Sequence, residues 1–515
     1  MNMSTTVRDL IERQAAQRPQ ALYAVAADGT GAISYGELAG GSRRVAALLQ
    51  RHGVAPGETV ALVMANGLGT LRLLLGALWG GRCVNPVNLL AQPEQMRYVI
   101  AHSDCKLVVV APAWEASVRA LLEGLDRPVG LLVADPDALA LPGELEAAEF
   151  APEPAPGPDA TALLMYTSGT TGVPKGVMLS QSNLAANAQS IAAEHSLTPA
   201  DRVLGVLPLY HINAFAVTML APLASGGSVA MAGRFSAARF WSQAIESRCT
   251  WLNVVPTIVS YLIEGDAPAR AGLAGIRFCR SASAALAPDH LLGFEQKFGI
   301  GVIETMGLTE TVAPSFSNPL DRGCRRLGSV GRASGCEARV VGVALRPVAD
   351  GTTGEIAIRG PHVMQGYYKN AAATQAAFTP DGWLRSGDLG HRDADGFFFI
   401  TGRIKELIIK GGENIAPREI DEVLLRHPSV LEAAAVGVAD KHYGQDIEAY
   451  LVLRPGADVE VAQLRQHCLD HLGRYKSPRA CHIVDDLPRG PSGKVQRLKL
   501  QEIAADRIQA TLTLH

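Results

Sequence analysis

The chain has 515 residues, of which 48% are hydrophobic and 19% are charged, and this composition excludes an intrinsically disordered protein. The formal net charge of -3 excludes the global positive field that proteins with nucleic-acid partners carry. A chain of this length exceeds what one hydrophobic core normally organises, so we expect two or more domains.

The cysteines and the N-terminal segment favour the cytoplasm as the cellular compartment. None of the eight cysteines has CxxC spacing, which favours reduced thiols over a disulfide framework or a zinc site. Residues 1–22 are charged and amphipathic and lack the apolar core of a signal peptide. The longest apolar runs, such as "LLLGALWGG", are too short to cross a bilayer. We therefore predict a cytoplasmic protein without a transmembrane segment.

The first ~150 residues alternate helical and strand patterns, as α/β proteins do. The apolar spacing of residues 33–53 predicts a helix that ends on Gly53, and residues 59–67 and 106–112 read as buried strands. A proline-rich connector follows at 151–160. It is either a domain boundary or an exposed loop that leads into the next strand, and the sequence leaves both open.

The α/β alternation continues from about residue 200 to about 320, after which the pattern changes. Residues 337–368 are rich in strand formers and broken by glycines, which predicts a small sheet or barrel, and residues 393–403 predict a hairpin. A new α/β pattern of about 110 residues begins after Arg403, which is long enough for a separate small domain.

One short stretch indicates chemistry. The segment "YTSGTTGVPKGV" (166–177) follows the apolar run 162–165 directly. Its glycines free backbone N–H groups to surround an anion, its hydroxyls add donors, and Lys175 adds a single positive charge. We interpret it as a phosphate-binding loop, although a flexible surface loop is the simpler alternative. It is not a Walker A loop, because no Gly-Lys is followed by Ser or Thr.

Further motifs follow that loop in order, namely "PLYHINAF", "MGLTE", "GWLRSGDLG", "GRIKELIIKGGENIAPREIDEVL" and "PRGPSGKVQR". Together they resemble the adenylate-forming superfamily of acyl-CoA synthetases, adenylation domains and luciferases, in its AMP-dependent acyl-CoA ligase branch, over essentially the whole chain. The resemblance implies an α/β fold. Residues 1–402 would form a large N-terminal ATP- and acid-binding domain of layered α/β subdomains with a small β-barrel-like part. Residues 403–515 would form a small, mobile C-terminal α+β lid domain.

The resemblance also implies a reaction. A carboxylate attacks the α-phosphate of ATP, pyrophosphate leaves, and the thiol of CoA then displaces AMP. Such a reaction joins anions, so it needs charge neutralisation more than acid–base chemistry. The implied catalytic residues are Lys494, Thr309, Glu310 and His211. Glu310 would hold Mg²⁺, and Lys494 would reach the carboxylate and the α-phosphate.

The nucleotide site implied by the resemblance combines the phosphate-binding loop with later motifs. Asp388 would accept hydrogen bonds from the ribose hydroxyls with help from Arg403. At Met306 the chain departs from the family, which usually has an aromatic residue stacked on adenine, but a methionine still packs on a ring. The full set implied for ATP and AMP is Thr167, Ser168, Gly169, Thr170, Thr171, Gly172, Lys175, Ser283, Ala284, Glu304, Thr305, Met306, Asp388 and Arg403.

The acid and the thiol have implied sites of their own. The acid pocket would consist of His211, Ile212, Asn213, Asn253, Ser283, Thr305 and Gly307. Its polar side chains suit a small, aryl or oxygenated acid better than a long alkyl chain, because buried amides without partners are costly. The resemblance places the domain hinge at Lys405. It assigns the CoA tunnel to Gly411, Gly412, Glu413 and Tyr475.

The leading hypothesis is therefore an AMP-forming carboxylate–CoA ligase whose partners are ATP, Mg²⁺, CoA and a small carboxylic acid. One alternative is a stand-alone enzyme that loads the phosphopantetheine of a carrier protein, since both thiols use the same tunnel. A second alternative is a catalytically silent nucleotide-binding paralogue, against which the presence of Lys175, Glu310, Asp388, Arg403 and Lys494 argues. The sequence is compatible with a homodimer.

Overall fold

The computed structural model describes residues 5–144, 153–167, 173–489 and 495–513, with side chains described up to residue 506. The chain forms two compact units. The first unit comprises Met1–Ala285, Gly293–Ala338 and Ile358–Leu384, and the second comprises Leu286–Leu292, Arg339–Ala357 and Arg385–His515. Both contain helices and strands, which confirms the predicted α/β class. The predicted boundary between residues 402 and 403 stays a prediction.

In the first unit, the described residues form a seven-stranded sheet in the order β18-β8-β7-β4-β3-β5-β6. Its strands from β7 to β6 run parallel, while β8 forms an antiparallel hairpin with β7. The bounds are β3 (Thr59–Val63), β4 (Cys83–Pro86), β5 (Leu107–Val110), β6 (Gly130–Val133), β7 (Thr161–Thr167), β8 (Lys175–Ser180) and β18 (Gly366–Tyr367). Since β6 and β7 belong to one sheet, the described residues 153–160 of the proline-rich connector form a loop within that unit, and the alternative of a domain boundary there is wrong.

The helices along this part of the chain include the predicted one. Residues 35–51 form a helix that starts with a capping box between Ser34 and Glu37, and Gly53 follows its end with φ 74°. The buried strands predicted from apolar runs are β3 and β5. The helix bounds are α1 (Val7–Gln17), α2 (Tyr35–Arg51), α3 (Leu68–Trp79), α4 (Pro93–His102), η1 (Pro112–Trp114), α5 (Glu115–Glu123), α6 (Gln181–Glu194) and α12 (Ala371–Ala376).

A second sheet, nine-stranded within the described residues, has the order β15-β14-β13-β12-β11-β9-β10-β1-β2. The strands are β1 (Leu22–Ala26), β2 (Ala32–Ser34), β9 (Arg202–Gly205), β10 (Ser228–Met231), β11 (Trp251–Val254), β12 (Phe278–Ser281), β13 (Val302–Met306), β14 (Phe316–Ser317) and β15 (Arg332–Ala333). Its helices are η3 (Ala214–Leu220), α7 (Ala221–Ser225), α8 (Ala237–Glu246), α9 (Pro256–Glu264), α10 (Arg270–Leu273), α11 (Pro288–Phe298), η4 (Thr309–Thr311) and η5 (Arg322–Cys324).

The strand directions in this sheet decide where its functional segments lie. Strands β9, β11, β12 and β13 run parallel, so their carboxyl ends meet at one edge. The segments after those ends contain the "YHINAF" and "MGLTE" motifs and the predicted nucleotide-site residues Ser283 and Ala284. Ligands of open parallel sheets bind outside the carboxyl ends of the strands, so the fold itself brings these motifs to one place.

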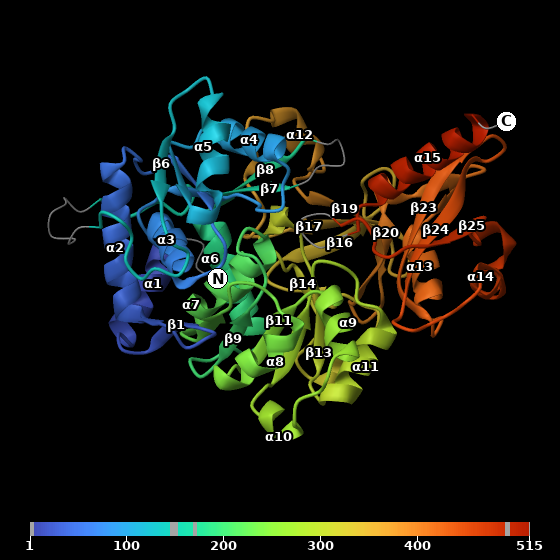
Figure 1. The fold of residues 1–515 in the computed structure, drawn as a ribbon, viewed down its shortest axis with the longest axis horizontal. Coiled ribbons are helices and arrows are strands. Elements are labelled where there is room, and N and C mark those ends of the chain that lie inside the picture. The colour runs from blue at the N-terminus through green and yellow to red at the C-terminus, as the bar shows by residue number, and fades with distance from the viewer. Residues whose placement is uncertain (1–4, 145–152, 168–172, 490–494, 514–515) are drawn as a thin grey trace. The chain divides into compact units, whose positions relative to one another are not determined.

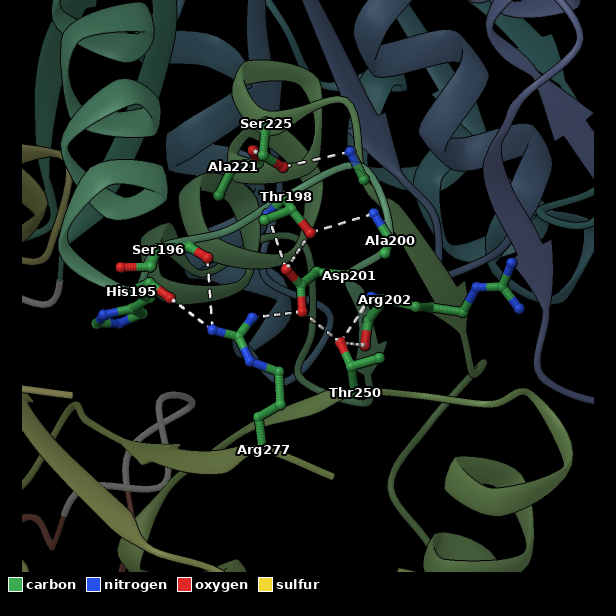
Figure 2. A network of polar contacts seen from close by, with 11 residues as sticks. His195, Ser196, Thr198, Ala200, Asp201, Arg202, Ala221, Ser225, Thr250 and Arg277 are labelled. Carbon is green, nitrogen blue, oxygen red and sulfur yellow. Dashed lines mark hydrogen bonds and ion pairs between the residues drawn. The ribbon is translucent and has the colours of Figure 1, made fainter. Parts of the chain in front are cut away.

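A polar network fixes the opposite edge of the same strands (Figure 2). Asp201 stands immediately before β9 and accepts hydrogen bonds from Thr198 N (2.7 Å), Thr250 Oγ1 (2.8 Å) and Arg277 Nη1 (2.6 Å). Thr250 immediately precedes β11 and Arg277 immediately precedes β12. Burial favours a higher pKa for Asp201, but Arg277 and the hydrogen bonds lower it below its usual value. One ionised carboxylate therefore ties together the starts of three neighbouring strands.

Replacing Asp201 with Asn is expected to lower the free energy of unfolding at neutral pH by about 3 kcal/mol, because Arg277 then loses its buried counterion. Because the folded pKa lies below the unfolded value of about 3.9, the stabilisation is complete above the unfolded pKa and is lost as pH falls through the folded pKa. Urea unfolding, followed by tryptophan fluorescence, measures the free energy of unfolding of wild type and of Asp201→Asn. The difference between these two free energies should shrink below about pH 4. Asp350→Asn is the control, since Asp350 makes an exposed pair with Arg392 at 2.7 Å. Equal effects of the two substitutions would contradict the account.

The small sheet or barrel predicted from residues 337–368 is an open four-stranded sheet that includes the hairpin, in the order β16-β17-β19-β20, and most of its residues belong to the second unit. Its strands are β16 (Glu337–Val341), β17 (Gly354–Arg359), β19 (Leu384–Arg392) and β20 (Phe398–Arg403). Strands β19 and β20 are antiparallel, which confirms the predicted hairpin at 393–403. The short helix η6 (Ile404–Glu406) follows β20 directly.

The rest of the second unit is built on a five-stranded sheet within the described residues. The strands are β21 (Ile408–Lys410), β22 (Glu413–Ile415), β23 (Val430–Asp440), β24 (Gly444–Leu453) and β25 (Ala480–Ile483), and the helices are α13 (Pro417–Leu425), α14 (Val461–Lys476) and α15 (Arg497–Thr513). Alternate residues of β23 enter two separate cores: Ala435 packs with Ile420 and Leu424, while Val436 packs with Leu500 and Ala504. The sheet therefore has a helix-covered core on each face.

Among the helices of the described ranges, none has the length and hydropathy that crossing a membrane requires.

Candidate active site

The ends of the predicted phosphate-binding loop are held by the β7–β8 hairpin. Thr167, the last residue of β7, pairs with Lys175, the first residue of β8. Ser168, Gly169, Thr170, Thr171 and Gly172 lie outside the described residues. The hairpin thus fixes Thr167 and Lys175, which stand at the two ends of the loop, beside each other.

A tyrosine that the sequence analysis missed connects two predicted site residues. Strand β18 pairs with β8, which places Tyr367 opposite Val177. The Nζ atom of Lys175 lies 4.9 Å from the centre of the Tyr367 ring, and the Tyr367 hydroxyl donates to Oε1 of Glu310 at 2.8 Å. Burial and then the charge of Glu310 raise the pKa of Tyr367, so its hydroxyl stays a donor. Lys175, Tyr367 and Glu310 form one cluster, the Lys175–Tyr367–Glu310 cluster.

The backbone holds Glu310 in place. Thr309 and Glu310 lie in η4, just after β13, and the N–H of Met364 donates to the carbonyl of Glu310 at 2.8 Å. Gly307 permits the tight turn between β13 and η4, since a Cβ there would come within 2.7 Å of the Cα atoms of Ala313 and Pro314. The position of the carboxylate therefore follows from the turn as well as from Tyr367.

Five of the residues predicted to bind ATP or AMP lie at the carboxyl ends of β12 and β13. Glu304 and Thr305 are buried within β13, and Met306 is half-buried at its end. Ser283 and Ala284 follow β12, and Ser283 has the left-handed φ of 75°. Since β12 and β13 are neighbours in the sheet, the structure brings these segments together, while their contacts with a nucleotide stay predictions.

The predicted acid pocket contains a hydrogen-bonded polar group. The amide of Asn213 donates to Ser283 Oγ at 3.2 Å, and the amide of Asn253 donates to Asn213 Oδ1 at 3.3 Å. Ile212 is buried, while His211 is partly exposed two residues before Asn213. Asn213, Asn253 and Ser283, which come from segments far apart in the sequence, thus form one hydrogen-bonded group in the predicted pocket.

A fourth member of this group was not predicted. Arg280, on β12, donates from Nη1 to Asn213 Oδ1 at 2.8 Å and to Asn253 Oδ1 at 2.7 Å. Its side chain is fully buried. The sequence signal was an arginine between Cys279 and Ser281 in a short strand, which alone does not distinguish a pocket residue from an edge-strand residue.

In the second unit, Asp388 and Arg403 form an ion pair. They are opposite each other in the β19–β20 ladder, and Arg403 Nε donates to Asp388 Oδ1 at 2.6 Å. The Asp388 side chain is 6% exposed and that of Arg403 is 41% exposed. The arginine therefore orients a largely buried carboxylate, and the contact of this pair with the ribose stays a prediction.

The predicted tunnel residues also lie in the second unit. Tyr475 donates its hydroxyl to the carbonyl of Lys410, and a Cβ on Gly411 would come within 2.8 Å of that hydroxyl. Gly411 has φ 56° and Gly412 has φ 87° in the exposed turn that leads to Glu413. The predicted hinge residue Lys405 is exposed within η6, and Lys494 lies outside the described residues.

The donor set for a metal is small. Among the residues with described positions, no group of three or more His, Cys, Asp or Glu side chains is arranged to hold a metal ion. Glu310 supplies a single partly exposed carboxylate beside the described end of the phosphate-binding loop. Such a site fits Mg²⁺, which commonly takes one or two carboxylates and completes its shell with waters and substrate phosphates.

Comparison with known proteins identifies the family. The model of the AMP-binding enzyme family matches residues 11–368, and the model of the AMP-binding enzyme C-terminal domain matches residues 419–494. The chain is 57% identical over 501 residues to a sulfoacetate–CoA ligase of Cupriavidus necator, covering 96% of this chain and 97% of the relative. It is 36% identical over 471 residues to an oxalate–CoA ligase of Arabidopsis thaliana, covering 88% and 90%.

The fold agrees with that family. The crystal structure of ATP-bound MatB from Rhodopseudomonas palustris matches with a TM-score of 0.88 at 31% identity, covering 97% of this chain and 99% of MatB. The chain therefore belongs to the AMP-binding enzyme family and is an AMP-forming acid–CoA ligase.

Proposed function

We propose that the chain converts sulfoacetate, or a closely similar small acid with a second anionic group, into its CoA thioester. The observation that carries this proposal is the 57% identity with a sulfoacetate–CoA ligase over 96% of the chain. The polar group of Asn213, Asn253 and Ser283 supports it, because amides and hydroxyls suit a small oxygenated acid better than an alkyl chain. The relative named for oxalate also takes a small acid with two anionic groups.

In the first step, the acid carboxylate attacks the α-phosphate of ATP and pyrophosphate leaves. Thr167 and Lys175 hold the outer phosphates at the described ends of the loop, and Ser168, Gly169, Thr170, Thr171 and Gly172 complete it. Glu310, oriented by Tyr367, would hold Mg²⁺. Bound Mg²⁺ would neutralise phosphate charge as it develops. Thr309 contacts the α-phosphate, and His211 lies beside the acid.

The second unit supplies the remaining roles in this proposal. Asp388 accepts hydrogen bonds from the ribose hydroxyls while Arg403 fixes its orientation. Lys494 brings a positive charge to the reacting carboxylate and the α-phosphate. The turn of Gly411 and Gly412, with Tyr475 against it, accommodates the pantetheine arm, and Lys405 is the hinge. In the second step the CoA sulfur attacks the acyl carbon and AMP leaves.

The proposal is tested by CoA-dependent AMP release across a panel of acids. The panel comprises sulfoacetate, oxalate, malonate, acetate, benzoate and dodecanoate. The expected result is the highest kcat/KM with sulfoacetate and none above background with dodecanoate. A preference for benzoate or for the long-chain acid would overturn the assignment of the acid.

Replacing Tyr367 with Phe is expected to raise the Mg²⁺ concentration needed for half-maximal rate by about ten-fold, because Glu310 loses the hydrogen bond that orients it. The measurement is acid-dependent ATP–pyrophosphate exchange as a function of free Mg²⁺. Tyr368→Phe is the matched control, because the neighbouring Tyr368 hydroxyl donates to Asp104 instead. The same Mg²⁺ dependence in wild type and Tyr367→Phe would rule out this role for the tyrosine.

A further inference from the structure

Arg280 is a buried cation whose hydrogen-bonding capacity is only partly used. Its side chain is 0% exposed, and Nη1 donates to the side-chain oxygens of Asn213 and Asn253. Its Nε and Nη2 atoms have no hydrogen-bond partner within the described part of the chain. Removing a charged guanidinium from water is costly, and neutral hydrogen-bond acceptors offset only part of that cost. A buried arginine is therefore normally paired with a carboxylate.

No such carboxylate lies beside Arg280 among the described residues. In the sheet, Ser281 pairs with Glu304, whereas Arg280 pairs with Ile303 and with Asn253. Because side chains alternate along a strand, Glu304 lies on the face opposite Arg280. Burial lowers the pKa of Arg280 to about 9, which still leaves it charged at neutral pH. Burial and then the charge of Arg280 lower the pKa of the neighbouring His195 to about 3, so His195 stays neutral.

The hydrogen bonds direct this charge toward the acid pocket. Arginine only donates, so Oδ1 of Asn213 must face Arg280. The Nδ2 group of Asn213 therefore points away from the arginine and donates to Ser283 Oγ. Ser283 is partly exposed at the carboxyl end of β12, where the predicted acid pocket lies. The amide thus presents its positive end toward that pocket and is held in this orientation by the buried cation.

We infer that Arg280 makes the acid pocket selective for acids with a second negative charge, acting as a positioning residue through Asn213 and Ser283. The acid supplies the counter-charge that the fold does not. This inference rests on the proposed function. If the distal anionic group of the acid lies roughly 8 Å from the guanidinium, at an effective dielectric constant of about 20, their attraction favours the charged acid over a neutral analogue by about 30-fold.

The test compares sulfoacetate with methylsulfonylacetate, in which a methyl group replaces one sulfonate oxygen and removes the distal charge while nearly keeping the shape. The readout is the ratio of the two kcat/KM values in CoA-dependent AMP release. Wild type is expected to prefer sulfoacetate by about 30-fold or more. Arg280→Met should bring the ratio to within about three-fold of unity, and Arg280→Lys should retain a large part of the preference.

A second variant, Asn213→Asp, tests the same inference if Arg280→Met does not fold. Asn213→Asp keeps the side-chain shape and places a carboxylate 2.8 Å from the Arg280 position, so it should also reduce the ratio. Arg277→Met is the matched control, because this arginine lies at the other end of the same strand and pairs with Asp201. In Arg277→Met, the ratio of kcat/KM for sulfoacetate to kcat/KM for methylsulfonylacetate should equal that of wild type.

The outcomes separate the inference from the function on which it rests. A wild-type enzyme that is active but shows the same ratio as Arg280→Met and Asn213→Asp would overturn the inference and leave the proposed function standing. Proportionate losses with both acids in Arg280→Met would show a purely structural arginine and would also overturn it. A wild-type enzyme that releases AMP with none of the acids would overturn the proposed function, and the inference with it.

Discussion

Replacing Glu310 with Gln is expected to lower the rate of acyl-adenylate formation by about 10²–10³, because one preorganised charge is lost where phosphate charge accumulates. Glutamine has nearly the shape of glutamate and can still accept the hydrogen bond from Tyr367. The turn that positions residue 310 depends on its backbone and on Gly307, so it should persist. The loss therefore reports the charge and not the fold.

Acid-dependent ATP–pyrophosphate exchange measures this step without CoA, and thermal unfolding of the same samples measures stability. The matched control is Glu337→Gln, since Glu337 is 64% exposed and pairs with Arg359 at 2.9 Å. Its exchange rate should be that of wild type. If Glu310→Gln exchanged pyrophosphate at the wild-type rate, this carboxylate would have no part in adenylation.

Replacing Asp388 with Ala is expected to raise the KM for ATP by roughly 100-fold, since two hydrogen bonds from the ribose to a charged acceptor would be lost at about 1.5 kcal/mol each. The side chain is nearly buried and already oriented by Arg403, so no rearrangement is needed on binding. The kcat at saturating ATP should change much less, because the ribose does not react.

Steady-state titration of ATP at saturating acid and CoA separates the two parameters. Asp393→Asn serves as the control because Asp393 lies in the same hairpin and its side chain accepts the backbone N–H of Phe397 at 2.8 Å, which an asparagine oxygen can still do. A fall in kcat at unchanged KM in Asp388→Ala would contradict a ribose contact and would place Asp388 in the chemical step.

Much of the fold was predictable because local sequence patterns indicated individual helices and strands. Apolar runs marked β3 and β5, helical spacing marked α2, and the run after Gly396 marked the β19–β20 hairpin. The π-helical stretch Ala214–Leu220 was not predicted, since a buried apolar run does not distinguish helix types. The proline-rich connector was ambiguous because its meaning depended on whether β6 and β7 share a sheet, which is a long-range property.

The site residues divide in the same way. Glu310, Asp388 and Arg403 were named because their motifs resemble those of the adenylate-forming superfamily. Tyr367 has no local signal, because it reaches Glu310 only when β18 pairs with β8. Arg280 was not predicted, because its partners Asn213 and Asn253 come from segments 67 and 27 residues away. Residues whose role depends on distant pairing therefore needed the structure.

The most direct test of the central claim is the product balance of the reaction with sulfoacetate, ATP, CoA and Mg²⁺, followed by mass spectrometry. We expect sulfoacetyl-CoA, AMP and pyrophosphate in equal amounts with the wild-type enzyme, and a loss of about 10²–10³ in rate with Lys494→Ala. Release of ADP, or of AMP without a CoA thioester, would contradict the account of an AMP-forming CoA ligase for this acid.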